Sequence, residues 1–277
     1  MLELCQKNTG RERGGRDRNA IWFSGAAVAL TWILVLSACS NDEARGQAVA
    51  VKEIKPGILE GYLRAEELPD SLALLPSPPQ EGSAAFARDE EVSRASLKLR
   101  GSPRWDQAVT DANLAFPAAT DAFSDALGFE VTEKDTPHLY ALLRRALTDA
   151  GLSTYAAKDH YKRRRPFMLN NQPIGTPDEE EGLREDGSYP SGHTAIGWAW
   201  ALILCEIVPD RTDAILARGR EFGQSRVICN VHWQSDVDSG RMMGSATVAR
   251  LHADDVFLTD LANAKAEASR THRGRRR

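Results

Sequence analysis

The segment from Thr194 to Val208 constrains the fold most, because nearly every residue in it is apolar and Pro209 follows directly. It is about fifteen residues long, whereas a helix that crosses a bilayer needs about 20. A helix that is apolar all round is buried in the core of a globular protein. The segment therefore predicts a central helix against which the other elements pack.

The sequence around this segment is also helical in pattern. Apolar residues recur at three- and four-residue spacings, and the alternating, β-branched runs typical of strands are almost absent. We therefore expect an all-α, single-domain helical bundle with long loops. The expected helices include Ala84–Leu99, Trp105–Phe116 and Leu139–Leu147, and the expected helix starts are Asp111, Asp121 and Thr136-Pro137.

Residues 1–39 have the layout of an export signal. A basic stretch that ends at Arg18 precedes the apolar run Ala20–Leu36, and Leu36-Ser37-Ala38-Cys39 resembles the lipobox of bacterial lipoproteins. Cys39 would then carry a lipid anchor. Ordinary cleavage near the same place and an uncleaved anchor are the alternatives. All three place the protein in the periplasm or elsewhere in the cell envelope.

The remaining chain divides into a tether (40–60), a folded domain (61–260) and a basic tail (261–277) that we expect to be without fixed structure. The end of this tail, 270–277, is rich in arginine and has no apolar partner. The net charge of the whole chain is −4 even though both ends are basic, so the domain between them is acidic. An acidic domain argues against a nucleic-acid-binding surface.

Two cysteines, Cys205 and Cys229, lie in the folded domain. Cys205 falls in the apolar segment and is expected to be a small core residue. A Cys205–Cys229 disulfide is the alternative in an oxidising compartment. Neither cysteine has neighbours at the spacing of metal ligands, and we expect no metal and no cofactor.

The first segment with chemical potential is Lys158–Pro166. Lys158 and Arg165 are seven residues apart, so on one helix they would share a face, and Pro166 would end that helix. Two cations released at a proline can meet around a single anion. The alternative is a solvated basic face, which the adjacent sequence Lys162-Arg163-Arg164 supports.

The second segment is Pro190-Ser191-Gly192-His193, directly before the central helix. The first N–H groups of a helix lack intrahelical partners, and together with the helix dipole they attract anions. Glycine permits close approach of a ligand, and His193 could donate a proton to a departing oxygen. In the alternative, Ser191 only caps the helix and His193 is a boundary residue.

The third segment is Ser225-Arg226, followed by His232 and Asp236. His232 and Asp236 are four residues apart and would be neighbours on a helix face. A carboxylate that binds one imidazole nitrogen fixes the tautomer and frees the other nitrogen to attack. The guanidinium of Arg226 matches the geometry of phosphate oxygens. A structural His–Asp hydrogen bond without chemistry is the alternative.

Together the three segments, K-x6-R-P, P-S-G-H and S-R-x5-H-x3-D, resemble the signature of the type 2 phosphatidic acid phosphatase superfamily at every position. Within it, the chain is similar to the bacterial class A non-specific acid phosphatases from about Gly61-Tyr62-Leu63 to Leu251-His252. The resemblance implies the helical fold shared by acid phosphatases and vanadium-dependent haloperoxidases. It also implies a metal-independent phosphatase that acts on phosphate monoesters.

The resemblance assigns a role to each residue of the signature. His232 would attack phosphorus and form a phosphohistidine, and Asp236 would orient it. His193 would protonate the leaving alcohol and then activate water. An alcohol or nucleoside could replace water, which gives phosphotransferase activity. Phosphate would be held by the side chains of Lys158, Arg165 and Arg226, the Ser191 hydroxyl, and the backbone of Ser191 and Gly192.

Three other classes use related chemistry: vanadate-dependent haloperoxidases, phosphate-binding proteins without turnover, and membrane lipid phosphatases. The extent of the resemblance disfavours the first, and His193, His232 and Asp236 disfavour the second. The third needs several membrane spans, which the body of the chain lacks. A homodimer is a further expectation, because exposed apolar helix faces often pair.

Overall fold

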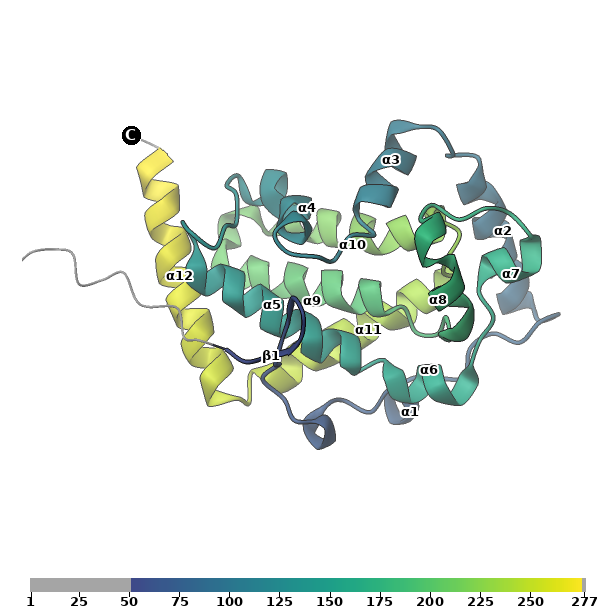
Figure 1. The fold of residues 1–277 in the computed structure, drawn as a ribbon, viewed down its shortest axis with the longest axis horizontal. Helices are drawn as coiled ribbons and strands as arrows, with labels where there is room; N and C mark the ends of the chain where they lie inside the picture. Colours follow the sequence, from purple (N-terminus) through teal and green to yellow (C-terminus); the bar gives the residue numbers. More distant parts are fainter. Residues whose placement is uncertain (1–50, 276–277) are drawn as a thin grey trace, which may run out of the picture. The chain divides into compact units, whose positions relative to one another are not determined.

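The computed structural model describes residues 51–275. The predicted export signal, Cys39 and most of the tether lie outside the described residues. The all-α prediction is confirmed: within the described range, the one sheet pairs the short antiparallel strands β1 (Glu53–Lys55) and β2 (Ile58–Leu59). A long helical bundle follows (Figure 1).

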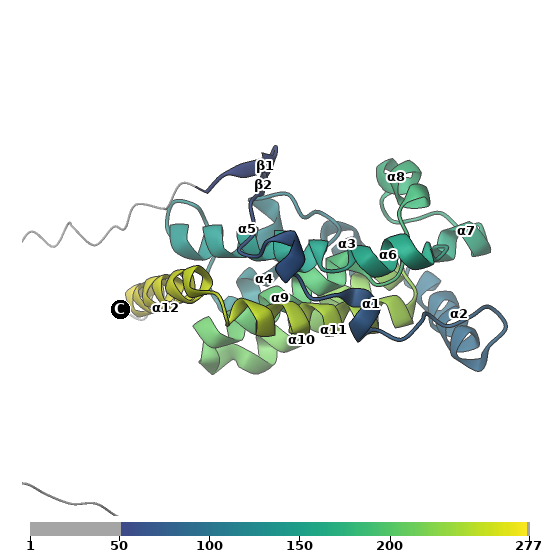
Figure 2. The ribbon, with the colours of Figure 1, turned by 90° about the horizontal axis from the view of Figure 1, so that it is seen from below.

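The predicted central helix is α9 (Gly192–Ile207), most of which is buried. It packs against α5 (Pro137–Leu152), α10 (Thr212–Ile228) and α11 (Gln234–Leu251). In Figure 2, α5 lies on one side of α9 while α10 and α11 lie on the other. The uniform apolarity of this segment is thus explained by neighbours on both sides.

Gly240 allows α11 to approach the start of α9 closely. A Cβ atom at this position would lie only 2.6 Å from the backbone oxygen of Ser191. Any larger residue would push the two helices apart, because such a contact is well inside van der Waals distance. The close approach brings the beginning of α11 beside the N-terminus of α9, where two of the predicted segments meet.

The C-terminal helix differs from the expected basic tail. Helix α12 (Asp255–Arg275) packs against α5, and Leu261, Ala264 and Ala268 are buried. Glu267 accepts hydrogen bonds from the backbone N–H groups of His138 and Leu139, at 3.3 and 3.0 Å. The buried residues follow a spacing of three and four, so the tail prediction was wrong for this stretch because its charges outweighed its apolar stripe.

The smaller helices surround this core, and two predicted boundaries were wrong. Asp111 follows the last residue of its helix, because α3 stops at Thr110, and α4 starts at Ala118 instead of Asp121. The start at Thr136-Pro137 is confirmed. The remaining helices are α1 (Ser71–Leu74), α2 (Ala84–Leu97), α3 (Pro103–Thr110), α4 (Ala118–Leu127), α6 (Tyr155–Tyr161), α7 (Pro166–Asn170) and α8 (Glu180–Glu185), with short 3₁₀ turns at Ala65–Glu67, Pro177–Glu179 and Pro209–Arg211.

The two cysteines of the domain are free, which rules out the Cys205–Cys229 disulfide considered above. Cys229 is buried, and burial raises the pKa of its thiol to about 11. Cys205 lies in α9 and is partly buried beside the core, as expected for a small core residue.

Candidate active site

Lys158 and Arg165 converge, but they do not share a helix as predicted. Lys162 has a left-handed conformation with φ 43° and ends α6, and Pro166 begins α7 instead of ending a helix. Proline is favoured at the first helical position because it has no N–H to satisfy there. Lys158 Nζ and Arg165 Nη2 each lie 2.9 Å from Oδ2 of Asp186. The two cations therefore do meet around one anion, here a carboxylate of the protein.

Asp186 was not singled out from the sequence. It follows α8, lies four residues before Pro190, and its carboxylate occupies the space between the two cations. Burial and Arg165 lower the pKa of Lys158 to about 8, and Asp186 opposes that effect. The acidic run Asp178–Asp186 in the sequence was the available signal, since six of its nine residues are acidic.

Ser191 precedes α9 as its N-cap, and its hydroxyl accepts the backbone N–H of Thr194 at 3.3 Å. The backbone N–H of Ser191 donates to the carbonyl of Asp236 at 3.0 Å. In this structure that N–H is therefore already bound to a carbonyl, and its binding to phosphate stays a prediction. The first helical N–H groups, those of Gly192 and His193, have no acceptor within the helix. Gly192 also faces Lys158, since a Cβ there would lie 3.9 Å from the lysine Cε.

The His193 ring is held by the loop between α3 and α4. Its Nε2 lies 3.0 Å from the carbonyl oxygen of Ala112. Because a carbonyl can only accept, Nε2 carries the hydrogen, and Nδ1 remains available for proton exchange. Burial, and the nearby cations Arg226, Arg165 and Lys158, lower the pKa of His193 well below its usual value. This contact was not predictable from the signature, since it involves a backbone atom far away in sequence.

The sequence predicts His232 and Asp236 on one helix face, but His232 lies just before α11. The helix begins at Gln234, so Asp236 sits in its first turn and reaches back to the imidazole. Nδ1 of His232 is 3.3 Å from Asp236 Oδ2, and Nε2 is 3.1 Å from Arg165 Nη1. A guanidinium only donates, so Nε2 presents its lone pair and Nδ1 carries the hydrogen.

Protonation of His232 is disfavoured in this environment. Burial and the cations Arg165, Lys158 and Arg226 lower the pKa of His232 well below its usual value. The imidazole is therefore neutral, with one nitrogen oriented by a carboxylate and the other directed toward the cations. This is the state that a nitrogen nucleophile requires.

Arg226 is the central cation of the site. It is fully buried, and none of its three guanidinium nitrogens has a hydrogen-bond partner among residues 51–275. The carboxylate of Glu179 lies 3.7 Å from Nη2, too far for a hydrogen bond. The backbone carbonyl of Arg226 accepts the backbone N–H of His232 at 3.2 Å, which links the two residues through their main chains. A buried guanidinium that makes no hydrogen bond indicates a site built to receive an anion.

Replacing Arg226 with methionine is expected to stabilise the ligand-free protein. The change removes a buried cation that makes no hydrogen bond, at similar side-chain volume, and its distant ion-pair partner Glu179 is 43% exposed to water. The free energy of unfolding should therefore rise by about 1–3 kcal/mol. Phosphate should no longer raise the melting temperature of the variant, although it raises that of the wild type. Thermal and denaturant unfolding with and without phosphate measure both effects. A less stable variant in phosphate-free buffer would contradict this role of Arg226.

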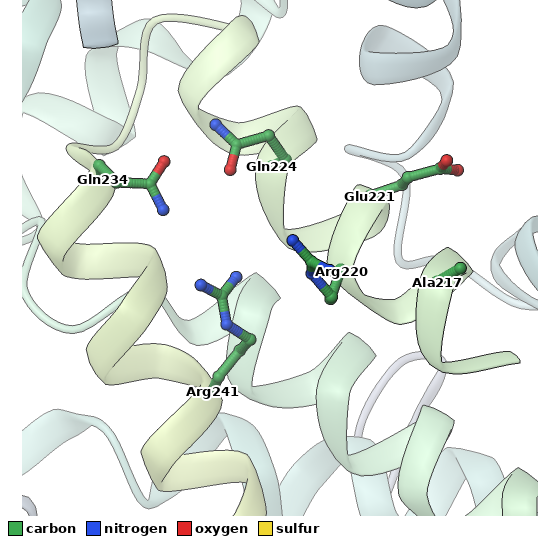
Figure 3. A pocket seen from close by; sticks show the side chains of 6 residues that line it. All are labelled: Ala217, Arg220, Glu221, Gln224, Gln234 and Arg241. Atoms are coloured by element: carbon green, nitrogen blue, oxygen red, sulfur yellow. The ribbon is translucent and has the colours of Figure 1, made fainter. Parts of the chain in front are cut away.

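A second concave region lies between α10 and α11, outside the predicted site. Figure 3 shows Arg220, Gln224, Gln234 and Arg241 around it, and Ala217 and Glu221 complete the lining. None of the fixed residues of the signature lines it, although Gln234 lies between His232 and Asp236 in the third segment. Among residues 51–275, no group of three or more His, Cys, Asp or Glu is arranged to hold a metal ion, and no helix has the length and apolarity needed to cross a membrane.

Comparison with known proteins agrees with this geometry. The PAP2 superfamily model matches residues 138–257. The chain is 48% identical over 207 residues to a non-specific acid phosphatase of Providencia stuartii, covering 74% of this chain and 84% of that protein. A non-specific acid phosphatase of Salmonella typhimurium is 43% identical over 220 residues, which cover 79% of this chain and 88% of that protein. An acid phosphatase of Zymomonas mobilis is 42% identical over 198 residues, which cover 72% of this chain and 75% of that protein. On this evidence the chain belongs to the non-specific acid phosphatases of the PAP2 superfamily.

Proposed function

We propose that this acid phosphatase hydrolyses phosphate monoesters through a covalent phosphohistidine at His232. The observation that carries the proposal is that one site holds both a buried Arg226 whose guanidinium makes no hydrogen bond and a neutral imidazole whose Nε2 lies 3.1 Å from Arg165. A phosphoryl group drawn to these cations is brought to the lone pair of that nitrogen. Binding and attack are thereby provided by the same few residues.

The cations hold the phosphoryl group in this mechanism. Arg226 binds it with nitrogens that make no hydrogen bond among the described residues, and the N–H groups at the start of α9 add donors on the side of Gly192. Lys158 and Arg165 join when the phosphate displaces the carboxylate of Asp186, which now lies 2.9 Å from both. When Nη1 of Arg165 turns to a phosphate oxygen, it leaves Nε2 of His232, and the lone pair of that nitrogen is free to attack.

The first step transfers the phosphoryl group to the enzyme. Nε2 of His232 attacks phosphorus, the bond to the ester oxygen breaks, and His193 gives its proton to that oxygen. A bound phosphate offsets the charges of Arg226, Arg165 and Lys158, which raises the pKa of His193 and favours the protonated form needed here. Asp236, at 3.3 Å from Nδ1, stabilises the positive charge that develops on the imidazole of His232.

The second step reverses these roles. His193, now neutral, accepts a proton from water as the water oxygen attacks phosphorus, and the N–P bond breaks. The products are inorganic phosphate and the original His232. An alcohol in place of water gives a new phosphomonoester, so the same intermediate supports phosphotransfer.

Partition between water and an alcohol tests this proposal. We expect two phosphomonoesters with different leaving groups to give the same ratio of transferred to released phosphate at one alcohol concentration, because both pass through one intermediate. The assay is run with EDTA present, and full activity is expected. A ratio that changes with the leaving group would mean that the alcohol attacks the substrate directly.

We also infer that the enzyme acts outside the cytoplasm, in the periplasm or on the cell envelope. The export-signal layout of residues 1–39 supports this, and the lipobox-like sequence before Cys39 supports a lipid anchor. Mass spectrometry of the protein isolated from membranes would reveal the lipid on Cys39. A homodimer stays a prediction from the sequence.

A further inference from the structure

Behind the His232–Asp236 pair lies a second buried cation, Arg163. Its Nη1 is 2.5 Å from Oδ1 of Asp236, and its Nη2 is 2.8 Å from Oδ2 of Asp89 in α2. Asp89 is held against the start of α11 by Ser235. It accepts hydrogen bonds from the Ser235 backbone N–H at 2.9 Å and from the Ser235 hydroxyl at 2.5 Å. An unbroken series of contacts therefore runs from α2 through Arg163 to the imidazole of His232.

The burial of these groups distinguishes Arg163 from a surface arginine. Its side chain is 8% exposed, against 3% for Asp89 and 0% for Asp236. The next residue, Arg164, is 54% exposed and pairs with the equally exposed Glu81. The guanidinium of Arg163 also lies within 6.0 Å of the ring centres of Phe86, Tyr189 and Trp233. The solvated basic face considered for this stretch is therefore correct for Arg164 and wrong for Arg163.

We propose that Arg163, anchored by Asp89, is a positioning residue that holds the Asp236 carboxylate in the orientation and charge state that His232 needs. The proposal rests on the proposed role of His232 as the nucleophile. Arg163 acts through Asp236 and does not contact the phosphate cradle in this structure. It extends the catalytic unit beyond the signature to α2.

The geometry explains why one carboxylate needs this partner. Asp236 uses Oδ2 for Nδ1 of His232, at 3.3 Å, and for the N–H of Trp233, at 2.8 Å. Oδ1 is left for Arg163, whose double contact with Asp236 and Asp89 sets the plane of the carboxylate. Without Arg163, a buried carboxylate would lose the cation in direct contact with Oδ1, and its plane would be less restricted.

The charge of Arg163 also sets the ionisation of Asp236. Burial raises the pKa of Asp236 to about 6, whereas Arg163 and the Trp233 N–H act in the opposite direction. Removing the cation makes the carboxyl harder to ionise, and a neutral carboxyl accepts the hydrogen of His232 Nδ1 only weakly and no longer offsets the positive charge that develops on the ring. Activity at low pH is then lost first. The charged and titratable groups that face Asp236 are Arg163, Asp89, His232, Lys158, Arg165 and Tyr189.

The test compares Arg163→Gln with Arg164→Gln, the same chemical change one residue away. We expect Arg163→Gln to lower kcat/KM about 100-fold, the scale of a misplaced catalytic group. The acid limb of its pH profile should move to higher pH. Arg164→Gln should keep the wild-type rate and profile. Arg163→Lys, which keeps the charge but reaches only one carboxylate, should keep the acid limb in place with a loss of about tenfold.

The outcomes separate this proposal from the phosphohistidine mechanism. A folded Arg163→Gln variant with the wild-type acid limb would overturn the positioning role, even if it is less stable. If Arg163→Gln does not fold, Arg163→Lys decides, and a wild-type rate in that variant also overturns the proposal. If wild-type enzyme itself forms no phosphohistidine, the proposed mechanism fails first, whatever the Arg163 variants do.

Discussion

Replacing His232 with alanine is expected to abolish turnover while the folded protein still binds phosphate. The variant lacks the nitrogen that attacks phosphorus, whereas Arg226, Lys158 and the start of α9 remain. Loss of a covalent nucleophile lowers kcat by at least about 10⁴-fold. Steady-state hydrolysis of an aryl phosphate measures the rate, and the phosphate-induced rise in melting temperature measures binding.

A matched control for this variant is His160→Ala. His160 is exposed on α6, two residues after Lys158, and has no place in the mechanism. His160→Ala should retain wild-type turnover, which would show that the loss of a nearby imidazole is harmless in itself. Normal turnover in His232→Ala would remove His232 as the nucleophile.

Asp236→Asn is expected to slow the reaction by about 10³–10⁴-fold, the scale seen when the carboxylate of such a pair becomes an amide. An amide can hold the wrong tautomer of His232, and it leaves the charge of Arg163 without its nearest anion. We expect phosphate binding to survive. Stopped assays of kcat and a far-UV spectrum of the variant check the rate and the fold.

Asp238→Asn is the control for this change. Asp238 lies on the same helix, its side chain is 57% exposed, and it pairs with Arg241 away from the site. The control should behave as wild type. An Asp236→Asn variant that is folded and retains more than about a tenth of the wild-type rate would contradict the orienting role of Asp236.

Much of the fold could be predicted because its signals are local. The uniform apolarity of Thr194–Val208 identified the central helix, since a helix covered on both sides has no polar face. The three signature segments were also recognisable, because each carries its residues within a few positions. Their meeting at the start of α9 follows from helix packing, which the small residue Gly240 permits.

Other features depend on contacts that spacing does not encode. A shared helix for Lys158 and Arg165 was a reasonable expectation, but Lys162 adopts a left-handed conformation that ends α6 between them. The contacts of His193 with Ala112 and of Lys158 with Asp186 join separate parts of the chain. Three consecutive arginines look alike in sequence, and only tertiary packing buries Arg163 while Arg164 stays exposed.

The most direct test of the mechanism is to trap the phosphoryl-enzyme. Wild-type enzyme and His232→Ala are mixed with a ³²P-labelled phosphomonoester in EDTA and quenched within one turnover in alkaline denaturant, which preserves phosphohistidine. We expect an alkali-stable, acid-labile label on the peptide that contains His232 in the wild type, and none in the variant. Phosphate released by the wild type within one turnover without any protein-bound label, or a label of the same size on His232→Ala, would contradict the mechanism.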